Sequence, residues 1–255
     1  IPERLELPEP SQAVLRAARA LLRRKERKAT GKFLVEGPQA VREALKQPEV
    51  VEAVFFRWAA VHDHLELLTA ARAAGVANYA VSEQNIATIT DTVTPQGVVA
   101  VCRALDVPLA EAVTPEVRLV VICAQIRDPG NAGTVIRCAD AFGADAVILS
   151  SDSVEVYNPK TVRASVGSVF HLPLVVGVDL AEVLADVHVL AVQARGAAQG
   201  RGGAQRRGGQ VVEVAAAAAL GAQAPLAEHV PLQQAGMAQA AVDVVSAGVA
   251  LLLVL

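Results

Sequence analysis

The sequence has few aromatic residues, few cysteines and little net charge. Aromatic residues make up 3% of its 255 residues against 53% hydrophobic residues, so its core must consist mainly of Ala, Val and Leu. Cys102, Cys123 and Cys138 are far apart in the sequence and have no metal-ligand spacing. Because Cys102 and Cys123 fall in apolar runs, we expect buried thiols in a reducing compartment. The formal charge of −3 indicates no polyanionic partner by itself.

The sequence also lacks a long hydrophobic run. Its most apolar stretch, residues 244–255, is shorter than the roughly 20 residues that cross a membrane, and we expect a buried helix there. No secretory signal precedes the first helical pattern. These features predict a cytoplasmic protein without membrane or metal partners.

Basic residues are nevertheless concentrated near the N-terminus. Between Arg16 and Lys32 the only acid is Glu26. Such a stretch is a candidate nucleic-acid-binding surface, although a solvated helix face is an equally good interpretation of charge alone. The candidate RNA-binding residues are Arg23, Arg24, Lys25, Arg27, Lys28 and Lys32.

The first part of the chain reads as a compact α/β domain. Ser11 is a candidate N-cap for a helix over 11–28, and Pro38 is suited to the first position of a second helix. The remaining expected helices are 61–74 and 83–89, and the expected strands are 32–37, 50–56, 77–82 and 97–102. We place this domain at 1–103 and a proline-containing linker at 104–117.

The second part, 118–255, alternates short apolar runs with helical patterns. The expected strands are 119–123, 146–149, 172–176 and 187–193. Alternation of this kind is typical of a parallel sheet covered by helices. Residues 195–210 contain only Ala, Gly, Arg and Gln and read as a flexible basic loop.

One strand-to-helix junction in this part carries two polar residues, Asn131 and Arg137. The stretch RDPGNAGTVIRC has neither the Lys-Ser/Thr ending of a phosphate-binding P-loop nor the glycine pattern of a dinucleotide site. Asn131 is either an N-cap or a site residue. Arg137 has apolar neighbours in the sequence, so we expect a buried guanidinium that needs a partner such as phosphate.

Two stretches resemble a known family. NAGTVIRCADAFGADAVIL (131–149) and VRASVGSVFHLPL (162–174) are similar to the first two signatures of the SpoU (TrmH-type) RNA 2′-O-methyltransferases of the SPOUT superfamily. LLRRKERKATGKFLVEG and ITDTVTPQGVVAV (89–101) resemble their small substrate-binding domain, which is similar to ribosomal protein L30e. The resemblance covers about residues 15–193.

This resemblance implies a fold and a chemistry. It implies an N-terminal L30e-like α/β domain and a C-terminal parallel-sheet α/β domain with a deep trefoil knot that binds S-adenosylmethionine (SAM). It implies a homodimer whose two subunits form the pocket together. Its catalytic residues would be Asn131, Arg137, Arg163 and Ser165. Because a guanidinium is always protonated, we favour phosphate binding and oxyanion stabilisation for Arg137 over a role as base.

The third family signature is not recognisable. Val230–Pro231–Leu232 is kept, but no Ser-Leu-Asn follows it. Three explanations stay open: a divergent active enzyme, a non-methylating relative that still binds RNA, or a recorded sequence that departs from the gene after residue 193. The resemblance places the SAM contacts on Ala194, Gly196, Gly221, Val230, Pro231, Leu232 and Met237.

The leading hypothesis is therefore SAM-dependent 2′-O-methylation of structured RNA. Ribosomal RNA, 23S rRNA in particular, is the expected substrate, in a housekeeping role or as protection against a ribosome-targeting antibiotic, and tRNA is the alternative. A catalytically inactive RNA-binding homodimer is the second hypothesis. A generic nucleotide-binding α/β enzyme is disfavoured by the absence of a phosphate-loop pattern.

Overall fold

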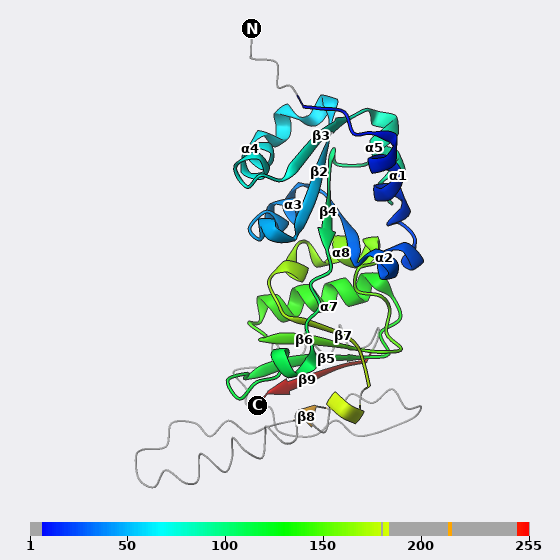
Figure 1. Ribbon diagram of the computed structural model, residues 1–255. Helices are drawn as coiled ribbons and strands as arrows, with labels where there is room; N and C mark the ends of the chain where they lie inside the picture. The colour runs from blue at the N-terminus through cyan, green and yellow to red at the C-terminus, as the bar shows by residue number, and fades with distance from the viewer. Residues whose placement is uncertain (1–6, 180, 184–213, 216–248, 255) are drawn as a thin grey trace, which may run out of the picture. The chain divides into compact units, whose positions relative to one another are not determined.

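The computed structural model describes residues 7–179, 181–183, 214–215 and 249–254 (Figure 1). The chain divides into two compact units, residues 1–105 with 157–170 and residues 106–156 with 171–255. The boundary after Leu105 falls inside the predicted linker, and helix α6 (Leu109–Ala112) of that segment packs into the core of the second unit.

The first unit contains a four-stranded sheet in the order β1-β4-β2-β3. Strand β4 is antiparallel to both β1 and β2, and β2 is parallel to β3. The strands are β1 (Lys32–Glu36), β2 (Val51–Arg57), β3 (Ala77–Val81) and β4 (Val98–Arg103). The helices are α1 (Gln12–Ala20), α2 (Arg24–Thr30), α3 (Pro38–Ala44), α4 (Leu65–Ala73), α5 (Glu83–Thr88) and α8 (Pro159–Ser165), with 3-10 turns η1 (Pro48–Val50), η2 (Trp58–Ala60), η3 (His62–His64) and η4 (Ser168–Phe170).

The side chains of successive residues of β1 point to opposite faces of this sheet. Leu34 belongs to a core cluster that includes Leu15 of α1 and Ile86 of α5. Phe33 points to the opposite face, as alternation along a strand requires. Its ring stacks on Tyr157 at 4.5 Å and on Phe170 at 6.1 Å between centroids. The segment 157–170 therefore covers β1 on the face opposite α1 and α5.

The predicted helix over 11–28 is two helices. Ser11 is the N-cap of α1, as expected, and its Oγ accepts a hydrogen bond from the amide of Val14 at 3.3 Å. The chain turns after Leu21, where the buried guanidinium of Arg27 donates to the carbonyls of Leu21 and Leu22 at 2.8 and 2.9 Å. Arg27 thus satisfies carbonyls that the end of α1 leaves unpaired, which makes the break stable.

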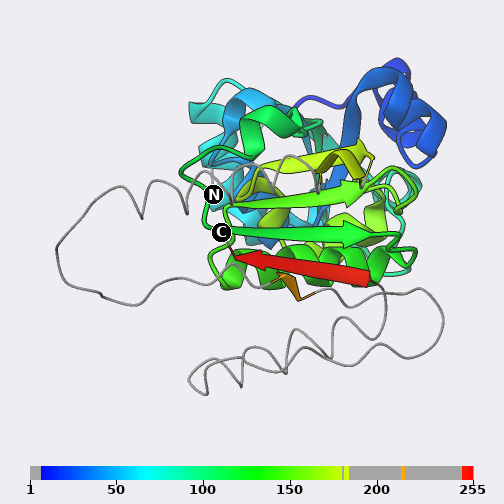
Figure 2. The ribbon, with the colours of Figure 1, turned by 90° about the horizontal axis from the view of Figure 1, so that it is seen from below.

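The second unit contains a five-stranded mixed sheet in the order β7-β6-β5-β9-β8. Strands β5, β6 and β7 are parallel, whereas β9 is antiparallel to β5 and β8. In Figure 2 the red arrow of β9 runs against the green arrow of β5 beside it. The elements are β5 (Leu119–Ala124), α7 (Pro129–Ala141), β6 (Ala146–Ser150), β7 (Leu174–Val178), β8 (Val214–Ala215) and β9 (Val249–Val254).

The α/β class is confirmed, but the expectation of a buried helix over 244–255 is wrong. Val249–Val254 is a strand, and it pairs along the whole of β5, from Leu119↔Val254 to Ala124↔Val249. A short apolar run without helical periodicity fits a buried strand as well as a helix, and pairing with β5 decides between them. The predicted strand 187–193 and the chain crossing of a knot lie outside the described residues, so both stay predictions.

The thiols of Cys102 and Cys123 are buried, as the sequence predicts, and all three cysteines are free. Burial raises the pKa of the Cys123 thiol to about 12, and it raises the pKa of Cys102 further. These two residues are therefore unreactive core thiols.

Candidate functional site

Helix α7 starts at the carboxyl end of β5, where ligands of parallel α/β sheets usually bind. Its N-cap is Asp128, whose Oδ1 accepts a hydrogen bond from the amide of Asn131 at 2.9 Å. Asn131 is therefore not the cap, and that interpretation of the sequence is wrong. The cap lies three residues earlier because Pro129 occupies the first helical turn. Asn131 is left within the first turn, partly exposed.

The expectation of a buried guanidinium at Arg137 is also wrong, because Arg137 is exposed. Neighbours in the sequence are not neighbours on a helix: Val135, Ile136 and Ala139 face the core, while Arg137 lies on the outer side. Asn131, Thr134 and Arg137 follow one another at a spacing of three residues, and none of the three is buried. This side of α7 can bind a group from outside the unit.

A network of polar groups that the sequence did not predict joins the carboxyl ends of β5 and β6. Ser150 Oγ accepts a hydrogen bond from the amide of Gln125 at 3.0 Å and donates to Asp152 Oδ1 at 2.8 Å. Ser153 Oγ donates to the carbonyl of Cys123 at 3.2 Å. Gln125 has a left-handed backbone with φ of 57°, rare outside glycine. These bonds fix the turn that leads into α7.

Asp152 is the one titratable group of this network with a shifted pKa. The hydroxyl of Ser150 donates to its carboxylate and lowers the pKa of Asp152 below the ordinary value. The signal in the sequence was the position of these polar residues, directly after two buried strands.

The two predicted catalytic residues of the second signature lie in the first unit. Arg163 and Ser165 both belong to α8. Ser165 is buried, and its Oγ donates to the carbonyl of Val162 at 2.7 Å. Asn131 and Arg137 lie in the second unit, so the predicted catalytic residues come from both units.

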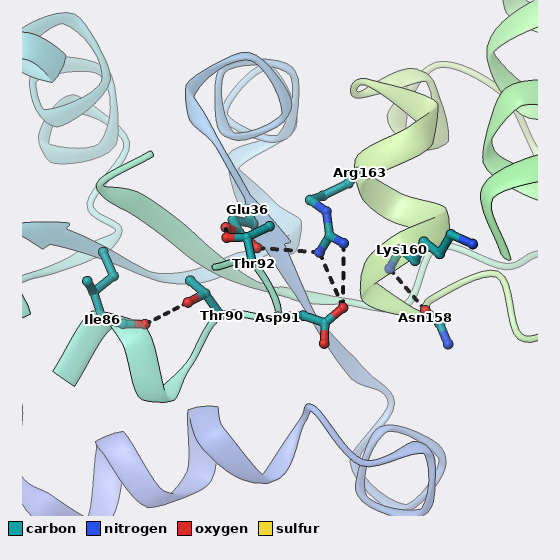
Figure 3. Close-up of polar contacts among 8 residues, drawn as sticks. All are labelled: Glu36, Ile86, Thr90, Asp91, Thr92, Asn158, Lys160 and Arg163. Carbon is teal, nitrogen blue, oxygen red and sulfur yellow. Dashed lines mark hydrogen bonds and ion pairs between the residues drawn. The ribbon is translucent and has the colours of Figure 1, made fainter. Parts of the chain in front are cut away.

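The guanidinium of Arg163 lies between two carboxylates (Figure 3). Its Nη1 is 3.6 Å from Glu36 Oε2 at the end of β1, and its Nη2 is 3.5 Å from Asp91 Oδ2 in the loop before β4. Thr92 Oγ1 of the same loop donates to the other oxygen of Glu36. Two stretches of the predicted substrate-binding domain, KFLVEG and ITDTVTPQG, thus meet the second signature.

The rest of the segment 157–170 is also fastened to the first unit. The hydroxyl of Tyr157 accepts a hydrogen bond from the amide of Leu105 at 2.6 Å. Gly167 has φ of 98°, and a Cβ built on it would lie 2.6 Å from Cγ of Glu43 in α3. Only glycine fits there, because the backbone is left-handed and the approach is close.

The predicted RNA-binding residues differ in their surroundings. Arg23, Arg24, Lys25 and Lys28 are exposed on or next to α2. Lys32 Nζ is 2.7 Å from Glu52 Oε2. Arg27 is buried with its guanidinium on the end of α1, so we drop it from the candidate surface. The charge of a residue was visible in the sequence, but its burial was not.

The predicted SAM-binding residues, from Ala194 to Met237, all lie outside the described residues. Within the described part of the chain, no group of three or more His, Cys, Asp and Glu side chains is arranged to hold a metal ion. No helix in the described ranges is long and apolar enough to span a bilayer.

The chain thus consists of a mixed α/β unit with polar groups at the carboxyl ends of its parallel strands and a small α/β unit with an exposed basic helix. Residues 118–207 match the SpoU rRNA Methylase family, and residues 13–100 match the MRM3-like substrate binding domain. The chain belongs to the SpoU rRNA methylase family.

Two curated relatives show the extent of this similarity. The 23S rRNA (guanosine(2553)-2′-O)-methyltransferase RlmP of Bacillus subtilis is 40% identical over 152 residues, which are 60% of this chain and 57% of that protein. The mitochondrial rRNA methyltransferase 3 of Mus musculus is 34% identical over 157 residues, 60% of this chain and 37% of that protein. The matched residues thus span little more than half of the length of RlmP and less than half of the length of the mitochondrial enzyme.

Two solved structures share the fold. The SpoU methyltransferase AviRb of Streptomyces viridochromogenes in complex with the cofactor AdoMet is 31% identical with a TM-score of 0.59, over 73% of this chain and 68% of that one. The AdoMet-bound rRNA methyltransferase of Sinorhizobium meliloti is 28% identical with a TM-score of 0.58, over 74% of this chain and 68% of that one.

Proposed function

We propose that this protein transfers a methyl group from SAM to a ribose 2′-hydroxyl of ribosomal RNA, with 23S rRNA as the substrate. The observation that carries this proposal is the double family match, a SpoU rRNA Methylase region preceded by an MRM3-like substrate binding domain. The relatives' names support it: RlmP and the 23S rRNA (uridine(2479)-2′-O)-methyltransferase of Streptomyces viridochromogenes both act on 23S rRNA.

The residues of α7 carry the acceptor side of this reaction. Methyl transfer to a hydroxyl needs the acceptor oxygen held in line with the methyl group, and negative charge develops on that oxygen as its proton leaves. Asn131, at the start of α7, orients the ribose. Arg137 binds the adjacent phosphate and stabilises the developing charge. Its exposed position on the outer side of α7 suits an external anion.

The predicted cofactor residues suit SAM by their chemistry. Small and apolar residues leave backbone groups accessible to the adenine and the amino acid part of the cofactor and surround it with apolar surface. The residues that would hold it are Ala194, Gly196, Gly221, Val230, Pro231, Leu232 and Met237. SAM supplies a methyl group on a positively charged sulfur.

RNA docking belongs to the first unit in this proposal. The exposed side chains of Arg23, Arg24, Lys25 and Lys28 neutralise phosphates, with Lys32 at the margin of this surface. Binding to phosphates does not depend on the base sequence of the RNA.

We further propose that the protein acts in the cytoplasm and that two copies of the chain form a homodimer. Sedimentation velocity tests the homodimer directly. A protective role against a ribosome-targeting antibiotic is a separate proposal, tested by the drug sensitivity of a host that expresses the chain.

Tritium transfer from labelled SAM to 23S rRNA tests the central proposal. The wild-type chain should label the RNA, and ribonuclease digestion should place the label on a ribose. Arg137→Ala should lose most of this labelling. Arg118→Ala is its matched control, because Arg118 is also an exposed arginine of the second unit but directly precedes β5, at the amino end of that strand. A wild-type protein that binds RNA tightly and labels none of it would show that the proposal is wrong.

The absent third signature favours one alternative, an RNA-binding homodimer without catalysis. Strand β9 adds to this, because it occupies the place of the expected final helix. Calorimetry with SAM separates the two functions: an enzyme binds the cofactor, and an inactive relative binds it weakly or not at all.

A further inference from the structure

The two carboxylates around Arg163 differ in burial and in attachment. The side chain of Glu36 is 8% exposed, and Thr92 Oγ1 holds its second oxygen. The side chain of Asp91 is 53% exposed and faces both terminal nitrogens of the guanidinium with a single oxygen, at 3.5 Å each. Glu36 is thus a fixed partner, and Asp91 is a loosely held one.

The loop that carries Asp91 is anchored at its two ends and, next to Asp91, through the hydrogen bond from Thr92 to Glu36. At its start, Thr90 Oγ1 donates to the carbonyl of Ile86 at 3.1 Å (Figure 3). At its end, the carbonyl of Gly97 accepts a hydrogen bond from the amide of Arg57 at 2.8 Å. Between these anchors Val93 is fully exposed. The exposed side chain of Asp91 can therefore turn away from Arg163 without disturbing the sheet.

Charge also distinguishes the two partners. Two carboxylates face one guanidinium, and Lys160, one turn earlier in α8, points its ammonium away from them (Figure 3). This leaves an excess negative charge where an RNA phosphate would approach Arg163. A phosphate oxygen offers the same charge-assisted hydrogen bonds as a carboxylate and can take the place of the exposed one.

We propose that Glu36 is the positioning residue of Arg163, and that Asp91 holds the same guanidinium only until an RNA phosphate replaces it. The inference rests on the proposed function and extends it. The first unit then does more than dock RNA, because it supplies the carboxylate that aims an arginine of the catalytic signature. It also supplies a competitor that makes this arginine available only to an anion that displaces Asp91.

Neutral variants of the two carboxylates should change activity in opposite ways. Asp91→Asn removes the competitor and should lower the KM for RNA about three- to five-fold at unchanged kcat, the size expected for an exposed ion pair. Glu36→Gln keeps an acceptor for Thr92 but loses the charge that aims Arg163. It should lower kcat about ten-fold, with little change in KM, because a mostly buried carboxylate no longer orients the guanidinium 3.6 Å away.

Three measurements control for a merely structural role. Glu83→Gln removes another carboxylate from an arginine of the same unit, in the 2.8 Å pair with Arg57, and should change neither constant. Thermal melting should show that every variant is folded. In an Arg163→Ala background both carboxylate substitutions should lose their effect, because the residue through which they act is gone.

The outcomes separate this inference from the proposed function. If the wild-type chain methylates RNA and the two variants shift the same constant in the same direction, or their effects persist without Arg163, the inference is wrong and the function stands. If the wild-type chain transfers no methyl group, the proposed function is wrong, and RNA affinity then tests the inference. Asp91→Asn must bind RNA more tightly than the wild type, and Arg163→Ala must bind it more weakly. Any other pattern shows that no phosphate replaces Asp91 on Arg163.

Discussion

The two signatures of the methylase family are supported in different ways. Helix α7 of the first signature is capped by its own Asp128 and fixed through Ser150, within the unit that contains it. Helix α8 of the second signature lies in the first unit, where Glu36 and Asp91 hold its Arg163 and Phe33 stacks on Tyr157 and Phe170 of the same segment. The first signature is thus held by residues close to it in the sequence, whereas the second depends on residues far away in the sequence.

The largest expected effect separates the two arginines by their role in transfer. Arg137→Ala should lower methyl transfer at least about 100-fold, as loss of an oxyanion-stabilising group does, with SAM affinity unchanged. Arg163→Ala should lower it less, because Arg163 assists at the phosphate. Single-turnover tritium transfer and calorimetry measure both quantities. A parallel loss of SAM binding in Arg137→Ala would place that residue in the cofactor pocket.

The next effect concerns the attachment of the second signature. Gly167→Ala should destabilise the protein by about 3 kcal/mol, because its left-handed backbone is strained and its new Cβ lies 2.6 Å from Glu43 Cγ. Gly143→Ala is the matched control. Gly143 also has a left-handed φ, of 70°, but no atom lies within 4 Å of a Cβ there, so the cost should be about 1 kcal/mol. Urea unfolding measures both, and equal costs would show that close packing against α3 contributes nothing.

These contrasts explain what the sequence could predict. Periodicity located most helices and strands, and the motifs located both signatures. Burial of Arg137 was misjudged because its apolar sequence neighbours face the other side of α7. The partners of Arg163 were not predictable, since Asp91 is 72 residues away and only the folded chain brings them together. The strand at Val249–Val254 was missed because its partner β5 lies more than a hundred residues earlier.

A smaller effect tests the distinction between exposed and buried arginines near α2. Replacing Arg23, Arg24 and Lys25 with Ala should weaken RNA binding and reduce the slope of log affinity against log salt by about one for each phosphate that the variant no longer neutralises. Arg27→Ala should leave that slope unchanged and lower stability by about 2 kcal/mol, because two carbonyls at the end of α1 lose a charged donor. Filter binding over a salt series measures the slopes. A reduced slope in Arg27→Ala would return this residue to the RNA surface.

The smallest effect concerns the support of the first signature within its own unit. Ser150→Ala removes the donor that lowers the pKa of Asp152, so that pKa should rise toward its ordinary value. A carboxylate whose pKa is lowered by folding stabilises the protein above its unfolded pKa and loses that contribution as pH falls through the folded value. The wild-type protein should therefore lose slightly more stability on acidification than Ser150→Ala. Asp152 is exposed, so solvent keeps the difference small. Carbon-13 NMR of the carboxylate follows its titration, and an unchanged pKa in Ser150→Ala would mean that the Ser150 hydroxyl does not lower the pKa of Asp152.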